Sequence, residues 1–150
     1  MNKEDQLIDD LADLLVPRLI QRGFVVSAPR ETGERSPDPA AYDSANCARF
    51  VDPHHIGDGV LRRARFFFGE IASGGEIGSV ELADALDLKG PRSIPANLTI
   101  PLKKSAWRLG LEQPWEGDES GPRTIWRDRG GIAQRMVEAI DAELVRRGLA

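Results

Sequence analysis

The chain has 150 residues, a formal net charge of −4 and one cysteine, and 41% of its residues are apolar. That length allows one compact domain with some additional chain. A single cysteine excludes an intramolecular disulfide framework and favours a reducing compartment. No apolar run approaches the roughly 20 residues that span a bilayer, and the acidic start lacks the layout of a signal peptide. We therefore expect a soluble, cytoplasmic protein.

Charge is distributed unevenly along the chain. Residues 1–59 hold six basic and eleven acidic groups, a balance of −5, whereas residues 60–150 hold fourteen basic and thirteen acidic groups, a balance of +1. Residues 89–109 carry five basic side chains and no acidic one. This local excess indicates either a solvated helix face or a basic surface for an anionic partner.

The N-terminal part divides into a helix and a linker. Leucines recur at spacings of three and four over residues 4–22, which predicts an amphipathic helix, although Pro17 should kink or split it. We assign residues 1–26 to this helix, which either packs on the main domain or pairs with its copy. Residues 27–58 lose periodicity and are rich in Pro, Ser, Gly and charge, which predicts a linker or long loop.

The main domain is predicted over residues 59–150 and is mainly α with a small β-hairpin. Its expected elements are a helix at 60–73, an extended piece at 76–78, a helix at 79–86, a turn at 87–92, a helix at 93–109, a hairpin at 114–129 and a helix at 131–148. Ser93 is the expected cap of the third of these helices. That helix must also tolerate Pro101.

A short set of residues suggests how these elements pack. Ala83, in the helix SVELADAL, is small enough for a close crossing of two helices. After the turn DLKGP come Arg92-Ser93-Ile94, then Leu98, Leu102 and the exit Leu109-Gly110-Leu111. With the hairpin that follows, this pattern resembles a winged helix-turn-helix domain of the kind found in bacterial and phage transcriptional regulators. The resemblance covers a little under two-thirds of the chain.

The resemblance implies that the helix at 93–109 enters the major groove of DNA and that the hairpin at 114–129 is the wing. Lysine and arginine neutralise phosphates, while Asn, Ser and Thr bond to base edges. The candidate DNA-binding residues are Lys89, Arg92, Ser93, Asn97, Thr99, Lys103, Lys104, Trp107, Arg108, Arg123 and Arg127. Trp107 has packing under the hairpin as its alternative, and Arg127 has pairing with Asp128 or Glu138. The acidic residues Asp118 and Glu119 argue against a deeply inserted wing tip.

Other residues could suggest an enzyme. Cys47, His54 and His55 lie within a short stretch, but a structural zinc site needs about four ligands in recurring pairs. A catalytic Cys–His pair needs a preformed pocket and an orienting group. We predict no catalytic residue, no cofactor and no metal site, and we do not expect an enzyme.

The sequence thus favours sequence-specific binding of double-stranded DNA by a small transcriptional regulator. The alternative is a winged-helix adaptor in a multiprotein assembly, with Ile100 and Trp107 as an apolar contact patch. A homodimer through the helix at 4–22 or the helix at 131–148 is expected to match two half-sites.

Overall fold

The computed structural model describes residues 35–150, and the predicted helix at 4–22 lies outside the described residues. Ser36–Ala150 is one compact unit, mainly helical with a small three-stranded antiparallel sheet. Its elements are η2 (Pro39–Ala41), α2 (Ser44–Phe50), α3 (Asp58–Ile71), η3 (Ala72–Gly74), β1 (Glu76–Gly78), α4 (Ser79–Ala85), η4 (Pro91–Ser93), the π-helical turn η5 (Pro95–Thr99), α5 (Ile100–Arg108), β2 (Trp115–Asp118), β3 (Ile125–Asp128) and α6 (Ile132–Arg146). None of the helices among these described residues is long and apolar enough to cross a membrane.

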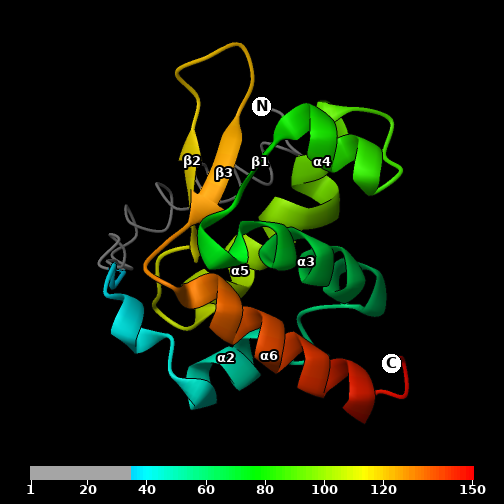
Figure 1. Cartoon of the computed structure of the whole chain (residues 1–150). Helices are drawn as coiled ribbons and strands as arrows, with labels where there is room; N and C mark the ends of the chain where they lie inside the picture. Colours follow the sequence, from blue (N-terminus) through cyan, green and yellow to red (C-terminus); the bar gives the residue numbers. More distant parts are fainter. Residues whose placement is uncertain (1–34) are drawn as a thin grey trace, which may run out of the picture. The chain divides into compact units, whose positions relative to one another are not determined.

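Helices α3 and α6 pack against each other and form the centre of the unit (Figure 1). The apolar stripe predicted for each helix is buried: Phe67 and Phe68 of α3, and Met136 and Ile140 of α6, are all fully inaccessible. A period of 3.6 residues brings such side chains onto one face, so burying that face selects the helix over any extended alternative.

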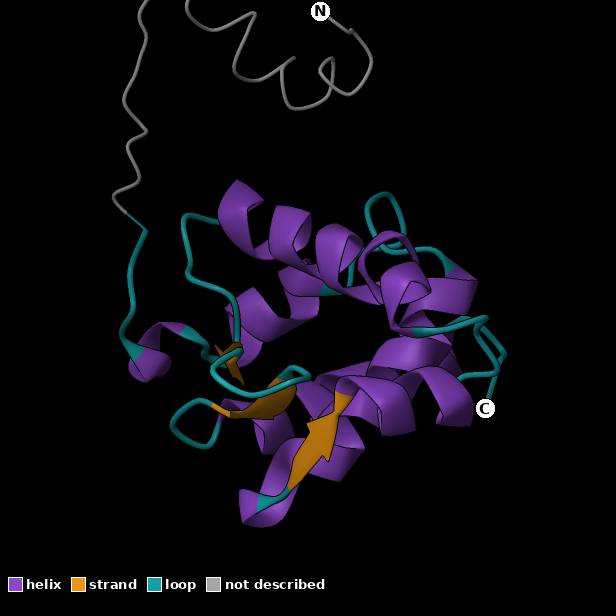
Figure 2. Ribbon diagram, turned by 90° about the horizontal axis from the view of Figure 1, so that it is seen from above, coloured by secondary structure: helices purple, strands orange, loops and turns teal. Residues whose placement is uncertain are grey.

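The sheet lies at one side of the helical body (Figure 2). Its strand order is β1-β3-β2, so the predicted hairpin is confirmed and the extended piece at 76–78 joins it as a third strand. Trp115 of β2 is buried and meets Phe67 edge-on at 5.5 Å between ring centroids. Trp126 of β3 meets the same ring edge-on at 6.0 Å. Edge-to-face contacts of this kind hold the hairpin on α3.

The prediction of a linker through residue 58 is wrong for the described part of that segment. Tyr42, Cys47, Phe50 and Ile56 are buried in the core, and α2 packs against α6. Asp43 caps α2, because its Oδ1 accepts the backbone N–H of Asn46 at 2.8 Å. Aspartate, proline and serine often begin short helices, but they are also common in loops. The composition of this segment therefore looked like that of a linker.

The compact unit consequently begins before the predicted boundary at residue 59. Ser36 forms an isolated parallel bridge with Leu111, in which its N–H donates to the Gly110 oxygen at 3.0 Å. The carbonyl oxygen of Ser36 in turn accepts the N–H of Glu112 at 3.0 Å. Residues 36–57 therefore belong to the same unit as the residues after them.

The ends of α4 and α5 share one hydrogen-bond pattern. At the end of α4, Leu88 N–H donates to the Ala83 oxygen at 2.9 Å, while Asp87 takes the left-handed conformation with φ 59°. At the end of α5, Leu111 N–H donates to the Ala106 oxygen at 3.0 Å, and Gly110 is left-handed with φ 76°. This motif usually has glycine at the left-handed position, and a short polar residue such as Asp also tolerates it.

Arg147 ties the end of α6 to the loop between α2 and α3. Its guanidinium donates to Glu143 at 2.6 Å and Asp58 at 2.8 Å, and to the backbone oxygens of Val51 at 3.0 Å and Ile56 at 2.9 Å. Burial by itself raises the pKa of Glu143, but hydrogen bonds and charges from arginine side chains outweigh burial and lower it. A buried carboxylate so paired stays charged at neutral pH.

We expect Arg147→Ala to lower the free energy of unfolding by about 3 kcal/mol, because it removes the donor to Asp58, Val51 and Ile56 and leaves the buried Glu143 with the mostly exposed Arg146 as its remaining partner. Arg65→Ala removes an ion pair to Asp141 in which both side chains are well exposed, so its cost should stay below about 1 kcal/mol. Urea unfolding of both variants measures the difference. Equal costs would show that the Arg147 contacts add nothing beyond those of a surface ion pair.

Candidate nucleic-acid interface

The helix that the sequence predicts over residues 93–109 begins later and contains a π-helical turn. Ser93 lies in η4 and does not cap the helix through its side chain, so that prediction is wrong. The carbonyl oxygen of Ser93 accepts a hydrogen bond from the side-chain Nδ2 of Asn97 at 2.7 Å. The helix then runs through η5 into α5 and ends at Arg108.

Pro101 is accommodated near the start of α5, and Arg63 supplies a missing donor. In a regular α-helix the N–H of residue 101 would bond to the oxygen of Asn97, but proline has no N–H and its ring crowds that carbonyl. Here Arg63 of α3 donates its Nε–H to the Asn97 oxygen at 2.7 Å. The wider π-helical turn gives the proline ring room, as such insertions do elsewhere in helices.

The inner side of this helix anchors it to the rest of the unit. Leu98, Leu102 and Ala106 are fully buried. Ser105, only 1% exposed, donates its hydroxyl to the backbone oxygen of Phe50 at 2.5 Å, which joins α5 to the end of α2. The helix is therefore held by packing and by hydrogen bonds that join it to two other helices, α2 and α3.

The outer side of the helix is an apolar stripe with cations beside it. Ile100 and Trp107 are 44% and 42% exposed. They stand seven residues apart, which is close to two helical turns. Ala96, one turn before Ile100, is exposed as well. Lys104 is exposed and Lys103 half-buried, and the helical repeat places these two lysines on opposite sides of the stripe.

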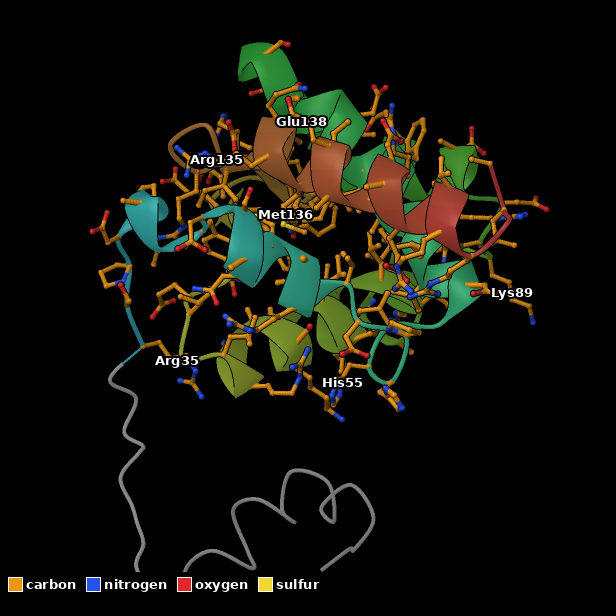
Figure 3. All side chains as sticks on the ribbon, turned by 90° about the horizontal axis from the view of Figure 1, so that it is seen from below. Arg35, His55, Lys89, Arg135, Met136 and Glu138 are labelled. Atoms are coloured by element: carbon orange, nitrogen blue, oxygen red, sulfur yellow. The ribbon has the colours of Figure 1, made fainter. Side chains whose placement is uncertain are left out.

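Two of the three predicted hydrogen-bonding residues, Asn97 and Thr99, are engaged or buried within the protein. Thr99 is only 7% exposed, and the amide nitrogen of Asn97 is bonded to Ser93. Arg92 is exposed on η4. Lys89 is exposed in the loop before η4 and projects outward, away from the molecule (Figure 3). The candidate interface on the helix itself therefore presents cations and apolar groups.

A groove separates this helix from the β2–β3 hairpin. Its volume is about 610 Å³, and its walls include Val80 of α4, Ile100, Pro122 and Trp126. Lys103 lines the groove from the helix side, and the acidic residue Glu119 lines it from the hairpin. Arg123 of the hairpin region lines the groove as well, so the groove combines apolar walls with charged residues of both signs.

Ion pairs neutralise the two predicted wing arginines. Arg123 pairs with Glu81 at 3.1 Å, and Arg127 pairs with Glu76 at 2.9 Å and with Asp118 at 3.6 Å. Hydrogen bonds from Ser120, aided by the charge of Arg127, lower the pKa of Asp118, so this carboxylate stays charged. Arg127 is therefore paired with acidic residues, which is the alternative that the sequence left open. Its partners are Glu76 and Asp118.

The opposite flank of the helix carries one arginine of its own and one from α2. Arg108 donates to the backbone oxygen of Arg49 at 3.1 Å and to the Ser105 hydroxyl at 2.9 Å. Arg49 is exposed and lies beside it at the end of α2. Sequence reasoning missed Arg49 because it fell inside the segment predicted to be a linker. The capping pattern of Asp43 before α2 is the signal that could have identified it.

Cys47 and the histidines are not assembled into a site. Cys47 is 2% exposed, and burial raises the pKa of its thiol to about 11, so the thiol is protonated at neutral pH. His54 pairs with Asp52 at the surface, and His55 projects outward (Figure 3). Within residues 35–150, no three potential ligands of the His, Cys, Asp or Glu type form a metal-binding group.

We expect Arg63→Ala to cost about 1–2 kcal/mol of folding free energy, because it leaves the Asn97 oxygen without the Arg63 donor. The cost should fall in a Pro101→Ala background, where residue 101 regains an N–H for that oxygen. Thermal or urea unfolding of the two single variants and the double variant gives the coupling. Arg62→Ala, an exposed neighbour on α3, is the matched control. An equal cost of Arg63→Ala in both backgrounds would contradict this account.

Comparison with known proteins adds no further likeness. No family model, no curated protein and no solved structure matches the chain.

Proposed function

We propose that the protein binds double-stranded DNA as a small transcriptional regulator, with the helix at 95–108 in the major groove. The observation that carries the proposal is the surface of this helix. Buried residues anchor one side of the helix, and the other side presents Lys103, Lys104 and Arg108. No carboxylate lies between residues 89 and 109. Cations along an exposed helix favour binding to a polyanion with a groove that is wide enough for a helix, and the major groove of DNA has this width.

The order of elements supports the same proposal. A helix, a strand, a second helix, the exposed helix and a hairpin follow one another, with sheet order β1-β3-β2. This is the order that the sequence resemblance to a winged helix-turn-helix domain implies. In that arrangement the second and third helices pack together, and the third lies in the major groove.

The distribution of charge indicates where phosphates bind. Both hairpin arginines are engaged with carboxylates, whereas Arg49 and Arg108 lie on the α2 flank of the helix. We therefore place the main phosphate contacts along the helix and its α2 flank. The hairpin contributes little to phosphate binding in this proposal.

The two lysines and the two hairpin arginines provide a matched test, since each pair removes two positive charges. Lys103→Gln/Lys104→Gln should weaken binding to a duplex by roughly 30-fold at 0.15 M salt and reduce the log–log salt slope by about 2. Arg123→Gln/Arg127→Gln should change both quantities much less. Titrations by fluorescence anisotropy at several salt concentrations measure affinity and slope together. If the lysine variant binds as well as the parent, the proposed interface is wrong.

A protein-binding adaptor is the second candidate, and the exposed apolar residues of the groove favour it. Val80 is 48% exposed and Ile100 is 44% exposed, and both line the groove beside the hairpin. Exposed apolar walls of this kind fit an apolar side chain of a partner protein. The predicted homodimer is compatible with either candidate and stays a prediction, since residues 4–22 lie outside the described part.

The adaptor candidate makes the opposite prediction for the same surface. The parent chain would not be retained on duplex DNA even at low salt. Ile100→Asp should then remove a protein partner recovered by crosslinking, because it places a charge in an apolar contact. Lys103→Gln/Lys104→Gln should leave that partner bound. Salt-sensitive retention on DNA by the parent would argue against this candidate.

A further inference from the structure

The side chains on the outer side of the helix suggest how a DNA sequence would be recognised. We propose that Ala96 and Ile100 contact the 5-methyl groups of thymines in the major groove, so that the protein prefers thymine-containing sites. This inference rests on the proposed DNA-binding function and names the feature of DNA that the helix reads.

The neutral polar side chains of the helix at 95–108 are largely engaged inside the protein. Thr99 is buried, the Asn97 amide nitrogen bonds to Ser93, and Ser105 donates its hydroxyl to the Phe50 backbone. These are the residue types that bond to base edges. Their engagement inside the protein leaves apolar atoms at the centre of the exposed side.

The apolar atoms lie on the exposed side of the helix. Ala96 and Ile100 are both exposed, and they stand near the two ends of the π-helical turn, slightly less than one of its turns apart, so they lie on adjacent parts of that side. Ile100 is 44% exposed. The two residues lie toward the start of the helix, and the N-terminal residues of a recognition helix are those that meet base edges.

Cations border the stripe. Lys103 and Lys104 follow on the next turn, on opposite sides of the stripe, and Arg92 is exposed before it. An apolar strip between cations fits a surface that is anionic at its edges and offers apolar groups between them. Phosphates border the major groove of DNA, and the thymine methyl is the apolar group among the polar base edges on its floor.

The expected size of the effect follows from the burial of one methyl group. Removing one such group from water is worth about a fourfold change in affinity, which corresponds to about 0.8 kcal/mol. The contact is therefore measurable one methyl at a time. It would add to the phosphate contacts without altering the salt slope, since no ion pair is involved.

Two pairs of duplexes that differ only in the 5-methyl group test the inference. The first pair is poly(dA-dT) and poly(dA-dU), and the second is poly(dG-dC) with and without 5-methylation of cytosine. We expect the methylated member of each pair to bind the full chain several-fold more tightly at equal salt. The ratio of the affinities for the methylated and unmethylated duplexes should fall toward one in Ile100→Ala. Removing the side chain and removing the methyl group form a double-mutant cycle, and their coupling measures the contact between them.

A matched control is Val145→Ala, which shortens an exposed apolar residue on α6 (68% exposed) and should keep the full ratio. Equal binding of methylated and unmethylated duplexes by the parent would overturn the methyl inference while leaving DNA binding intact. A ratio that persists in Ile100→Ala would overturn the assignment to Ile100. If no duplex binds even at low salt, the proposed function itself fails, and the methyl inference fails with it.

Discussion

The contact on which the rest of this unit depends is the packing of Phe67 against two tryptophans. Trp115 and Trp126 belong to the two strands of the hairpin, and both meet the Phe67 ring edge-on. The hairpin is thereby fixed to α3, and β1 is fixed to the hairpin through β3. Because β1 leads directly into α4, and Ser79 N–H donates to the Thr124 oxygen at 2.9 Å, one aromatic cluster sets the position of α4. The groove beside α5 is a consequence of that position.

The charges of the unit fall into two groups with different consequences. Those on the hairpin are paired across strands or with the start of α4, and exposed pairs of this kind contribute little to stability. Their main effect is to cancel the positive potential of the hairpin. The cations along α5 have no carboxylate neighbours in sequence, although Glu119 faces the groove that Lys103 lines. The described part of an acidic chain thus presents a limited basic surface.

The sequence predicted the long elements well, because α3 and α6 each bury a stripe that repeats with the helical period. It also predicted the hairpin, since a polar tip separates two short apolar segments. It missed α2, whose seven residues are too few to establish a period. Its packing depends on partners far along the chain, such as Tyr42, whose hydroxyl donates to the Glu112 oxygen. Distant partners of this kind leave no local pattern.

The candidate site was predicted less completely than the fold. Thr99, which the sequence predicted to bind DNA, is buried, whereas Lys104 and Trp107 are exposed. The residue type indicates which side chains could bond to a base, but their exposure depends on how the helix packs. The π-helical turn before Pro101 also departs from the regular repeat by which the faces of a helix are predicted.

The bond from Arg63 to Asn97 has a thermodynamic consequence for any ligand of this helix. Together with the bond from Ser105 to Phe50, it fixes the helix backbone at two points before a partner arrives. Binding then costs little conformational entropy, since no segment of this helix has to fold. The heat-capacity change of association would accordingly reflect the apolar surface of the interface alone, without the large contribution that accompanies coupled folding.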